Sequence, residues 1–171
     1  MKLALEVIND LQDKGLIKEY AIGGGVAGIF YTEPCYTKDL DIFVYADSNI
    51  FSGLISFSAI YDYLVSKGCK WEGEHIRVFN TLVQFLPAND LELDAIRKAN
   101  EIDYQGVNTK VFTAEHVIAI ALKTGRPKDM ERVRNIVDQY KELDYTKLYD
   151  ILKRYGLEEK FNEFRSKNTD R

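Results

Sequence analysis

Two carboxylates spaced two residues apart, Asp39 and Asp41, are the strongest candidates for chemistry in this sequence. They begin the segment D-L-D-I-F-V-Y, whose pattern predicts a β-strand over 40–45. Because residues two apart on a strand point to the same face, the two carboxylates would stand side by side. Neighbouring carboxylates repel each other unless a cation or a proton lies between them. The pair therefore predicts a site for Mg²⁺ (or Mn²⁺) shared with substrate phosphates. The alternative is a sheet edge with two solvated acids.

A glycine-rich turn precedes this pair by about 15 residues. The segment Gly23-Gly24-Gly25-Val26-Ala27-Gly28 follows a short apolar run and leads into a helical pattern. Glycines let the backbone approach a phosphate closely, and the first N–H groups of a helix attract anions. The spacing also fits the dinucleotide motif G-x-G-x-x-G, but the acids lie at the start of the next strand and Pro34 shortens the intervening helix. The turn therefore predicts a phosphate-binding loop, with a ligand-free tight turn as the alternative.

The elements that would position these residues alternate between strands and helices and then become helical throughout. The predicted strands are 20–22, 40–45, 76–79, 82–86 and 107–112. The predicted helices are 3–14, a segment from about Gly25, 51–66, 91–99, 114–123, 128–141, 144–155 and 157–165. The sequence thus predicts an α+β fold in which a mixed sheet flanked by helices (1–112) is followed by a C-terminal helical block (113–171), the two packed as one compact unit.

Composition excludes several classes of protein. A chain of 171 residues with 46% hydrophobic residues and three prolines is not a disordered low-complexity sequence. Its longest uncharged stretch, 48–61, is shorter than the roughly 20 apolar residues that a membrane span needs, so we expect no membrane partner. Two cysteines do not make a disulfide framework, which favours a cytoplasmic location. The cysteines and histidines have spacings that fit no compact zinc site, and His116, on an apolar helix, is expected to be a packed core residue or a cap residue.

Charge is distributed unevenly along the chain. Residues 1–122 hold ten Lys/Arg and 17 Asp/Glu, whereas residues 123–171 hold 13 and ten. The basic excess of the last third is small for a nucleic-acid footprint. We therefore favour a solvated helical face over a polyanion-binding surface.

A third segment carries further charged residues at the start of the helical block. Ala114–Lys123 has the sequence A-E-H-V-I-A-I-A-L-K and is followed, after Thr124, by Gly125-Arg126-Pro127-Lys128-Asp129. Together with the glycine turn and the D-L-D-I strand, it resembles the nucleotidyltransferase superfamily with the DNA-polymerase-β-like palm, in the branch that contains AbiEii-type abortive-infection toxins. The resemblance covers about residues 18–141. It implies Mg²⁺-dependent transfer of a nucleoside monophosphate from a nucleoside triphosphate to a hydroxyl of an RNA end, a protein or a small molecule.

The resemblance also assigns roles to individual residues. Asp39 and Asp41 would hold the metal, and Lys123 would contact a phosphate or the base with Asp129 orienting it. A plain helix-end pairing of Lys123 with Asp129 is the alternative. The nucleotide-binding residues that the resemblance implies are Gly23, Gly24, Gly25, Thr37, Lys38, Lys123, Arg126 and Asp129.

Gln84 is where the sequence departs from this family. Active members usually carry a third carboxylate on a later strand, which helps to activate the attacking hydroxyl, and the matching residue here is Gln84. An amide accepts a hydrogen bond but takes no proton, so Gln84 completes the predicted catalytic set without acting as a general base. Glu72 and Glu74 are alternative sources of a carboxylate. Two functions stay open: an active nucleotidyltransferase, or a catalytically weak or inactive nucleotide-binding module that works through an antitoxin-like partner.

Overall fold

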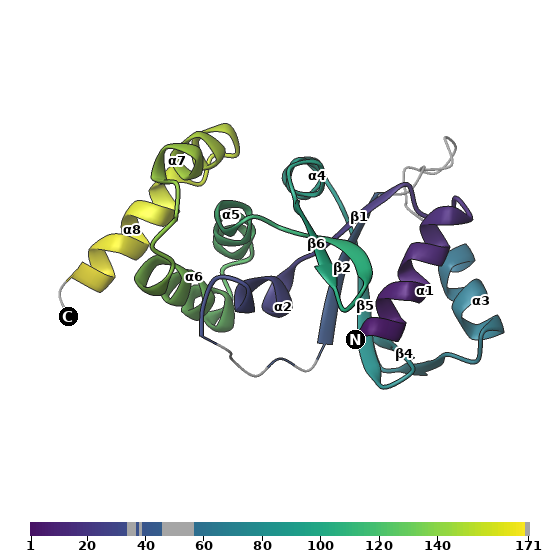
Figure 1. Cartoon of the computed structure of the whole chain (residues 1–171). Helices are drawn as coiled ribbons and strands as arrows, with labels where there is room; N and C mark the ends of the chain where they lie inside the picture. Colours follow the sequence, from purple (N-terminus) through teal and green to yellow (C-terminus); the bar gives the residue numbers. More distant parts are fainter. Residues whose placement is uncertain (34–36, 38, 46–56, 170–171) are drawn as a thin grey trace.

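A twisted, mixed sheet of seven strands forms the centre of the molecule, with helices on both of its faces (Figure 1). In this computed structural model, the described residues are 1–33, 37, 39–45 and 57–169. The strands are β1 (Glu19–Ile22), β2 (Asp39–Tyr45), β3 (Lys70–Glu72), β4 (His75–Val78), β5 (Thr81–Pro87), β6 (Asn100–Tyr104) and β7 (Val107–Val111). The helices are α1 (Lys2–Asp13), α2 (Gly24–Ile29), α3 (Ser58–Ser66), α4 (Asp90–Arg97), α5 (Ala114–Thr124), α6 (Pro127–Gln139), α7 (Tyr145–Arg154) and α8 (Glu158–Thr169).

The strand order is β3-β4-β5-β2-β1-β7-β6, which puts β2 near the middle of the sheet. β2 runs antiparallel to β1 and parallel to β5, and the β4–β5 and β6–β7 pairs are hairpins. The register of β2 against β5 places Asp41 opposite Gln84. The strand that begins with the two acids is therefore held between two neighbours along its length, so the positions of its side chains are set by the sheet.

Side chains of β2 alternate between the two faces of the sheet. Leu40, Ile42 and Val44 are buried on the face covered by α1 and α3 (Figure 1). On the α1 side, Leu5 and Ile8 follow helical spacing and are fully buried, which explains why this amphipathic segment folds against the sheet. Asp39, Asp41 and Phe43 point to the opposite face, towards the helical block.

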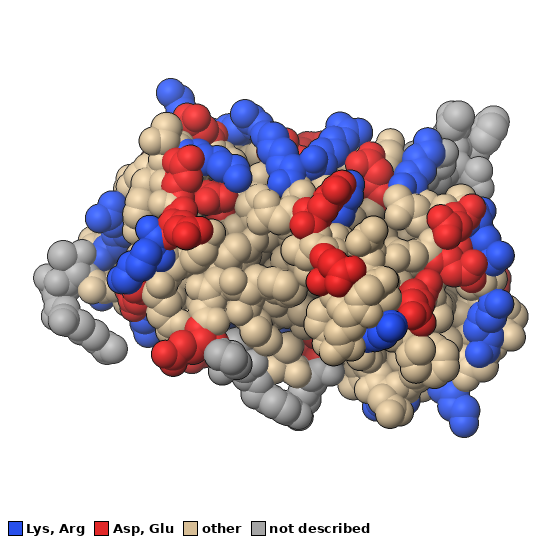
Figure 2. All heavy atoms as spheres, in the orientation of Figure 1, with Lys and Arg blue, Asp and Glu red and all other residues tan. Residues whose placement is uncertain are grey.

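Within the helical block (113–171), Gly125 and Pro127 separate α5 from α6. Gly125 closes α5 in the left-handed conformation (φ 72°), and Pro127 opens α6. α5 packs against α2 and α4 as well as α6 and α7, so it joins the block to the sheet. On the face shown in Figure 2, basic and acidic side chains are intermixed over α7 and α8, as expected of a solvated helical face. Among the helices that the structure describes, none is long and apolar enough to cross a membrane.

The structure confirms the α+β prediction, and its elements differ from the predicted ones in several places. The edge strands β3 and β6 were not predicted, because their mostly exposed residues lack an alternating apolar pattern. The helix predicted over 91–99 ends at Arg97, and the chain continues into β6. Most of the first half of the helix predicted over 51–66 lies outside the described residues, and α3 begins at Ser58.

Candidate active site

Asp39 and Asp41 stand on the same face of β2, where they lie at the boundary between two cavities. The larger cavity has a volume of about 630 Å³ and the smaller one about 280 Å³. Both cavities are also lined by Lys128 and Arg132, which project from α6. The two acids therefore face basic side chains across a divided cleft between the sheet and the helical block.

The environment of Asp41 disfavours its charged form. Burial raises the pKa of this carboxyl, and the neighbouring charge of Asp39 raises it further. The charges of Arg132 and Lys128 and a hydrogen bond from the Gly25 N–H act in the opposite direction without cancelling the rise. An additional cation at this position would relieve the repulsion between the two carboxylates.

The absence of side chains in the glycine turn leaves space for the Asp41 carboxylate. A Cβ on Gly24, which has φ +55°, would lie 2.6 Å from Cγ of Asp41 and closer still to Oδ2. A Cβ on Gly23 would lie 2.6 Å from Cδ2 of Phe43 and 2.8 Å from the ring of Phe112. These two glycines therefore serve to pack the sheet face against the turn, which the sequence prediction of a phosphate loop did not include.

Gly25, the third glycine, borders the larger cavity. A Cβ there would lie 2.7 Å from Oγ1 of Thr37, which also lines this cavity and donates a hydrogen bond to the carbonyl of Asp39. The turn and the segment before β2 thus approach each other beside the acids. Lys38, also predicted to bind nucleotide, lies outside the described residues.

The wall of the cleft opposite the acids is organised by Asp129, whose side chain is only 1% exposed. Its carboxylate accepts hydrogen bonds from Nε of Arg126 at 2.7 Å and from Nη1 of Arg132 at 3.0 Å. One turn of α6 separates Asp129 from each arginine, so a single buried acid orients both guanidinium groups. The prediction that Asp129 orients Lys123 is therefore wrong.

Lys123 instead contacts an acid that the sequence analysis did not single out. Its Nζ donates to Oε1 of Glu92 on α4 at 2.7 Å. Glu92 is 6% exposed and lines the smaller cavity together with Gln84. Helical spacing is the one sequence signal that could have indicated Glu92. It lies three and four residues before the apolar Ala95 and Ile96, so it shares their buried side of α4.

The alternative carboxylates proposed from sequence lie elsewhere. Glu72 is exposed and forms a bidentate pair with Arg77 on the neighbouring strand β4, and Glu74 is exposed in the turn between them. The residue of this hairpin that reaches the site is His75, whose Nε2 lies 3.1 Å from Oδ2 of Asp39. Only the register of the sheet brings His75 to the acid, so no sequence pattern could indicate it.

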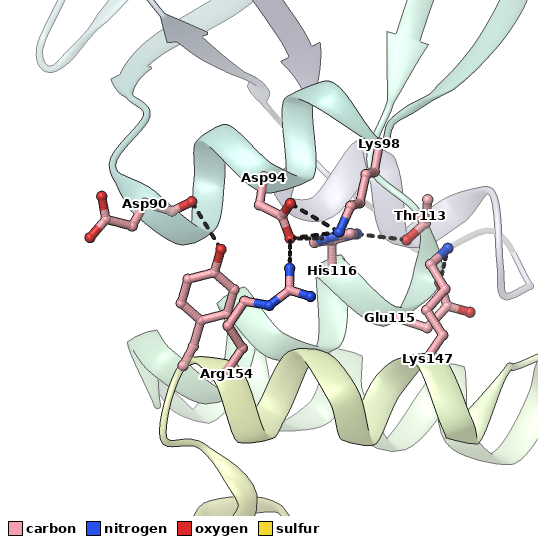
Figure 3. Close-up of polar contacts among 9 residues, drawn as sticks. Asp90, Asp94, Lys98, Thr113, Glu115, His116, Lys147 and Arg154 are labelled. Atoms are coloured by element: carbon pink, nitrogen blue, oxygen red, sulfur yellow. Dashed lines mark hydrogen bonds and ion pairs between the residues drawn. The ribbon is translucent and has the colours of Figure 1, made fainter.

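The position of α4 is set by contacts outside the cleft (Figure 3). Asp94 lies 3.0 Å from Nζ of Lys98, 3.3 Å from Nη1 of Arg154 and 3.4 Å from Nε2 of His116. His116 is fully buried, as predicted, and its Nδ1 lies 2.9 Å from the hydroxyl of Thr113. These contacts tie α4 to α5 and α7.

The residues present fit a divalent cation of the magnesium type. Mg²⁺ is usually held by one or two carboxylates and completes its shell with water and phosphate oxygens, and the Asp39–Asp41 pair opposite basic side chains offers that donor set. Over the described ranges, no group of three or more His, Cys, Asp and Glu residues is arranged to hold a metal by itself. The site therefore suits an ion that arrives with a phosphorylated substrate.

Comparison of the whole chain with solved structures identifies its fold. The chain is similar to an antigenic nucleotidyltransferase-like protein from Paracoccidioides brasiliensis, with 15% identity, 89% of this chain and 85% of that chain covered, and a TM-score of 0.52. The chain has the nucleotidyltransferase fold. Two structures of ANT(2'')-Ia share this nucleotidyltransferase fold with the chain, each at 16% identity and a TM-score of 0.51. One is a complex with adenylyl-2''-tobramycin, with 96% of each chain covered, and the other is a solution structure of this antibiotic-resistance factor, with 99% of this chain and 98% of that chain covered.

Sequence comparison adds no nearer relative. No family model matches the chain, and no curated protein matches it in sequence. The nucleotidyltransferase fold confirms the fold implied by the resemblance drawn from the glycine turn and the D-L-D-I strand, and membership of the superfamily stays a prediction. Membership of the AbiEii-type branch stays a prediction.

Proposed function

We propose that this protein is a Mg²⁺-dependent nucleotidyltransferase, which transfers a nucleoside monophosphate from a nucleoside triphosphate to a hydroxyl acceptor. The observation that supports this most directly is the position of Asp39 and Asp41 at the boundary of two cavities, facing Lys128 and Arg132. A transfer reaction needs two ligands that meet at one phosphorus atom. Two cavities that share a wall of acids and bases provide such a meeting point.

The side chains divide the work between the metal and the phosphates. Asp39 and Asp41 would hold Mg²⁺, which when bound neutralises the charge that develops as pyrophosphate leaves. Arg132 and Arg126, both oriented by Asp129, and Lys128 would bind phosphate oxygens. Because Asp129 already holds the guanidinium groups, little side-chain entropy is lost when the phosphates bind.

The larger cavity suits the nucleoside triphosphate, since its volume of about 630 Å³ lies within the usual range for ligand pockets. The acceptor hydroxyl would then approach the α-phosphorus from the smaller cavity. The acceptor oxygen forms a bond to the α-phosphorus, the bond from that phosphorus to the bridging oxygen of the β-phosphate breaks, and pyrophosphate leaves. The name of one structural neighbour's ligand, adenylyl-2''-tobramycin, makes a small polyhydroxylated molecule the first acceptor class to test, before RNA ends and protein hydroxyls.

Binding of Mg²⁺ and nucleotide tests the proposal. Thermal melts with ATP, GTP, CTP and UTP, each with and without Mg²⁺, should show stabilisation by one or more nucleotides that requires the metal. A ligand at 100 times its dissociation constant adds about 2.7 kcal/mol to the free energy of unfolding. The shift should vanish in Asp41→Asn and persist in Asp150→Asn, which makes the same change at an exposed position on α7. Absence of any Mg²⁺-dependent shift in the wild type would overturn the proposal.

Gln84 favours a second candidate, a nucleotide-binding module with weak or no catalysis that works through an antitoxin-like partner. The register places this amide opposite Asp41, at the point where a proton acceptor would be useful. This candidate predicts Mg²⁺-dependent nucleotide binding without release of pyrophosphate in the isolated chain. A pyrophosphate-release assay on the wild type therefore separates the two functions.

A further inference from the structure

We propose that Glu92 on α4 is the general base of this site, and that it accepts the proton of the attacking hydroxyl in place of a carboxylate at position 84. The inference rests on the proposed nucleotidyl transfer. Glu92 and Gln84 line the same cavity as Asp39 and Asp41. A helix that packs on the sheet therefore supplies the carboxylate that β5 lacks.

The first observation is an unpaired oxygen. The side chain of Glu92 is 8% exposed, and its Oε1 accepts a hydrogen bond from Lys123, but in the described part of the chain its Oε2 is buried and has no hydrogen-bond partner. A buried polar atom without a partner destabilises the folded state, so native structures rarely retain one without a reason. A substrate hydroxyl that donates to Oε2 would remove this cost when the acceptor binds.

The second observation is that Glu92 is held in place on both sides. Lys123 fixes one oxygen from α5. Two residues after Glu92, Asp94 contacts His116 of α5 and Arg154 of α7 (Figure 3). Two residues before it, the carbonyl of Asp90 accepts a hydrogen bond from the Tyr155 hydroxyl. A carboxylate that is oriented by its neighbours and keeps one oxygen free can accept the proton of a hydroxyl that reaches that oxygen.

The other acids of the site are less suited to this role. Asp39 and Asp41 are committed to the metal, and both oxygens of Asp129 accept hydrogen bonds from arginines. Gln84 takes no proton. In the proposed step, the acceptor oxygen bonds to the α-phosphorus as pyrophosphate leaves, the hydroxyl proton passes to the Glu92 carboxylate, and this proton leaves for solvent once the product has departed.

The test compares three variants for pyrophosphate release from the Mg²⁺–nucleotide that binds the wild type, with water or an added aminoglycoside as acceptor. Glu92→Gln keeps a carbonyl oxygen for Lys123 but takes no proton, so turnover should fall about 100-fold or more while Mg²⁺–nucleotide affinity is unchanged. Lys123→Met removes the partner but leaves the carboxylate, so its loss of turnover should be smaller. Glu115→Gln is the matched control. Glu115 is also a buried acid paired with a lysine, because its Oε2 lies 3.1 Å from Nζ of Lys147, but it does not line the cleft (Figure 3).

Each result has a separate meaning. Turnover of Glu92→Gln near the wild-type rate overturns the role of Glu92 and leaves the proposed function standing. Equal losses in Glu92→Gln and Lys123→Met also overturn it, because Glu92 would then act only by holding the lysine. A wild type that binds no Mg²⁺–nucleotide and releases no pyrophosphate overturns the proposed function and this inference together.

Discussion

Replacing Gly24 with alanine should lower the free energy of unfolding and disrupt the site through two separable effects. The first part is the backbone, because φ of +55° lies in the left-handed region and costs an alanine about 1–2 kcal/mol. The second part is steric, since the new Cβ would lie 2.6 Å from Cγ of Asp41. The carboxylate must move, and it then loses its hydrogen bond from the Gly25 N–H. A hydrogen bond to a charged group contributes about 1.5–3 kcal/mol.

A control variant isolates the second part. Gly106 has φ +83° in the β6–β7 turn, and a Cβ there would meet nothing within 4 Å. Gly106→Ala should therefore carry the backbone cost alone, and Gly24→Ala should cost about 1.5–3 kcal/mol more in urea denaturation. Mg²⁺–nucleotide binding, measured by calorimetry, should be lost in Gly24→Ala and retained in Gly106→Ala. Equal stability losses in the two variants, or intact binding in Gly24→Ala, would refute the reasoning.

Two further predictions concern buried charged groups. Burial lowers the pKa of His116, although Asp94 opposes this, and Lys147 and Lys98 act with burial. Because the unfolded chain then binds a proton that the folded chain does not, the free energy of unfolding should fall as pH drops below about 6.5, by up to about 1.4 kcal/mol per pH unit. Urea melts at pH 7.5, 6.5 and 5.5 should show this loss in the wild type and a flatter dependence in His116→Gln; equal slopes would contradict it. Asp129→Asn leaves Arg126 and Arg132 with a neutral partner, so Mg²⁺–nucleotide affinity should weaken by about tenfold, which corresponds to about 1.4 kcal/mol. Calorimetry checks this, and an unchanged affinity would contradict the role of Asp129 in orienting the arginines for the phosphates.

Local periodicity was enough to predict the centre of the site. The two-residue repeat of a strand places Asp39 and Asp41 on one face, and the resemblance to a known family indicated Gln84, which the parallel register sets opposite Asp41. The predicted helices 114–123 and 128–141 end and begin within one residue of the joint between α5 and α6, where the backbone preferences of Gly125 and Pro127 are local. The shared face of the two acids and the joint between α5 and α6 held because each depends on a few neighbouring residues, whereas the catalytic part of Gln84 stays a prediction.

The residues that sequence reasoning missed depend on tertiary packing. Glu92 reaches the smaller cavity only because α4 packs on α5, and His75 reaches Asp39 only through the order of strands in the sheet. Arg132 becomes part of the cleft because Asp129 orients it one turn along α6. Spacing along the chain does not indicate such contacts, so the sequence motifs identify only some of the residues that line the site.

The shared wall between the two cavities has a consequence for the order of events. A nucleotidylated acceptor is a single molecule that would occupy both cavities, with its phosphodiester beside Asp39 and Asp41. Such a product keeps the contacts of both reactants and loses only those of pyrophosphate, so pyrophosphate would depart first and the nucleotidylated acceptor after it. The same argument gives a design for an inhibitor. A nucleoside joined through a phosphate to a polyhydroxylated group would gain from the linkage, because binding of one end holds the other at high effective concentration.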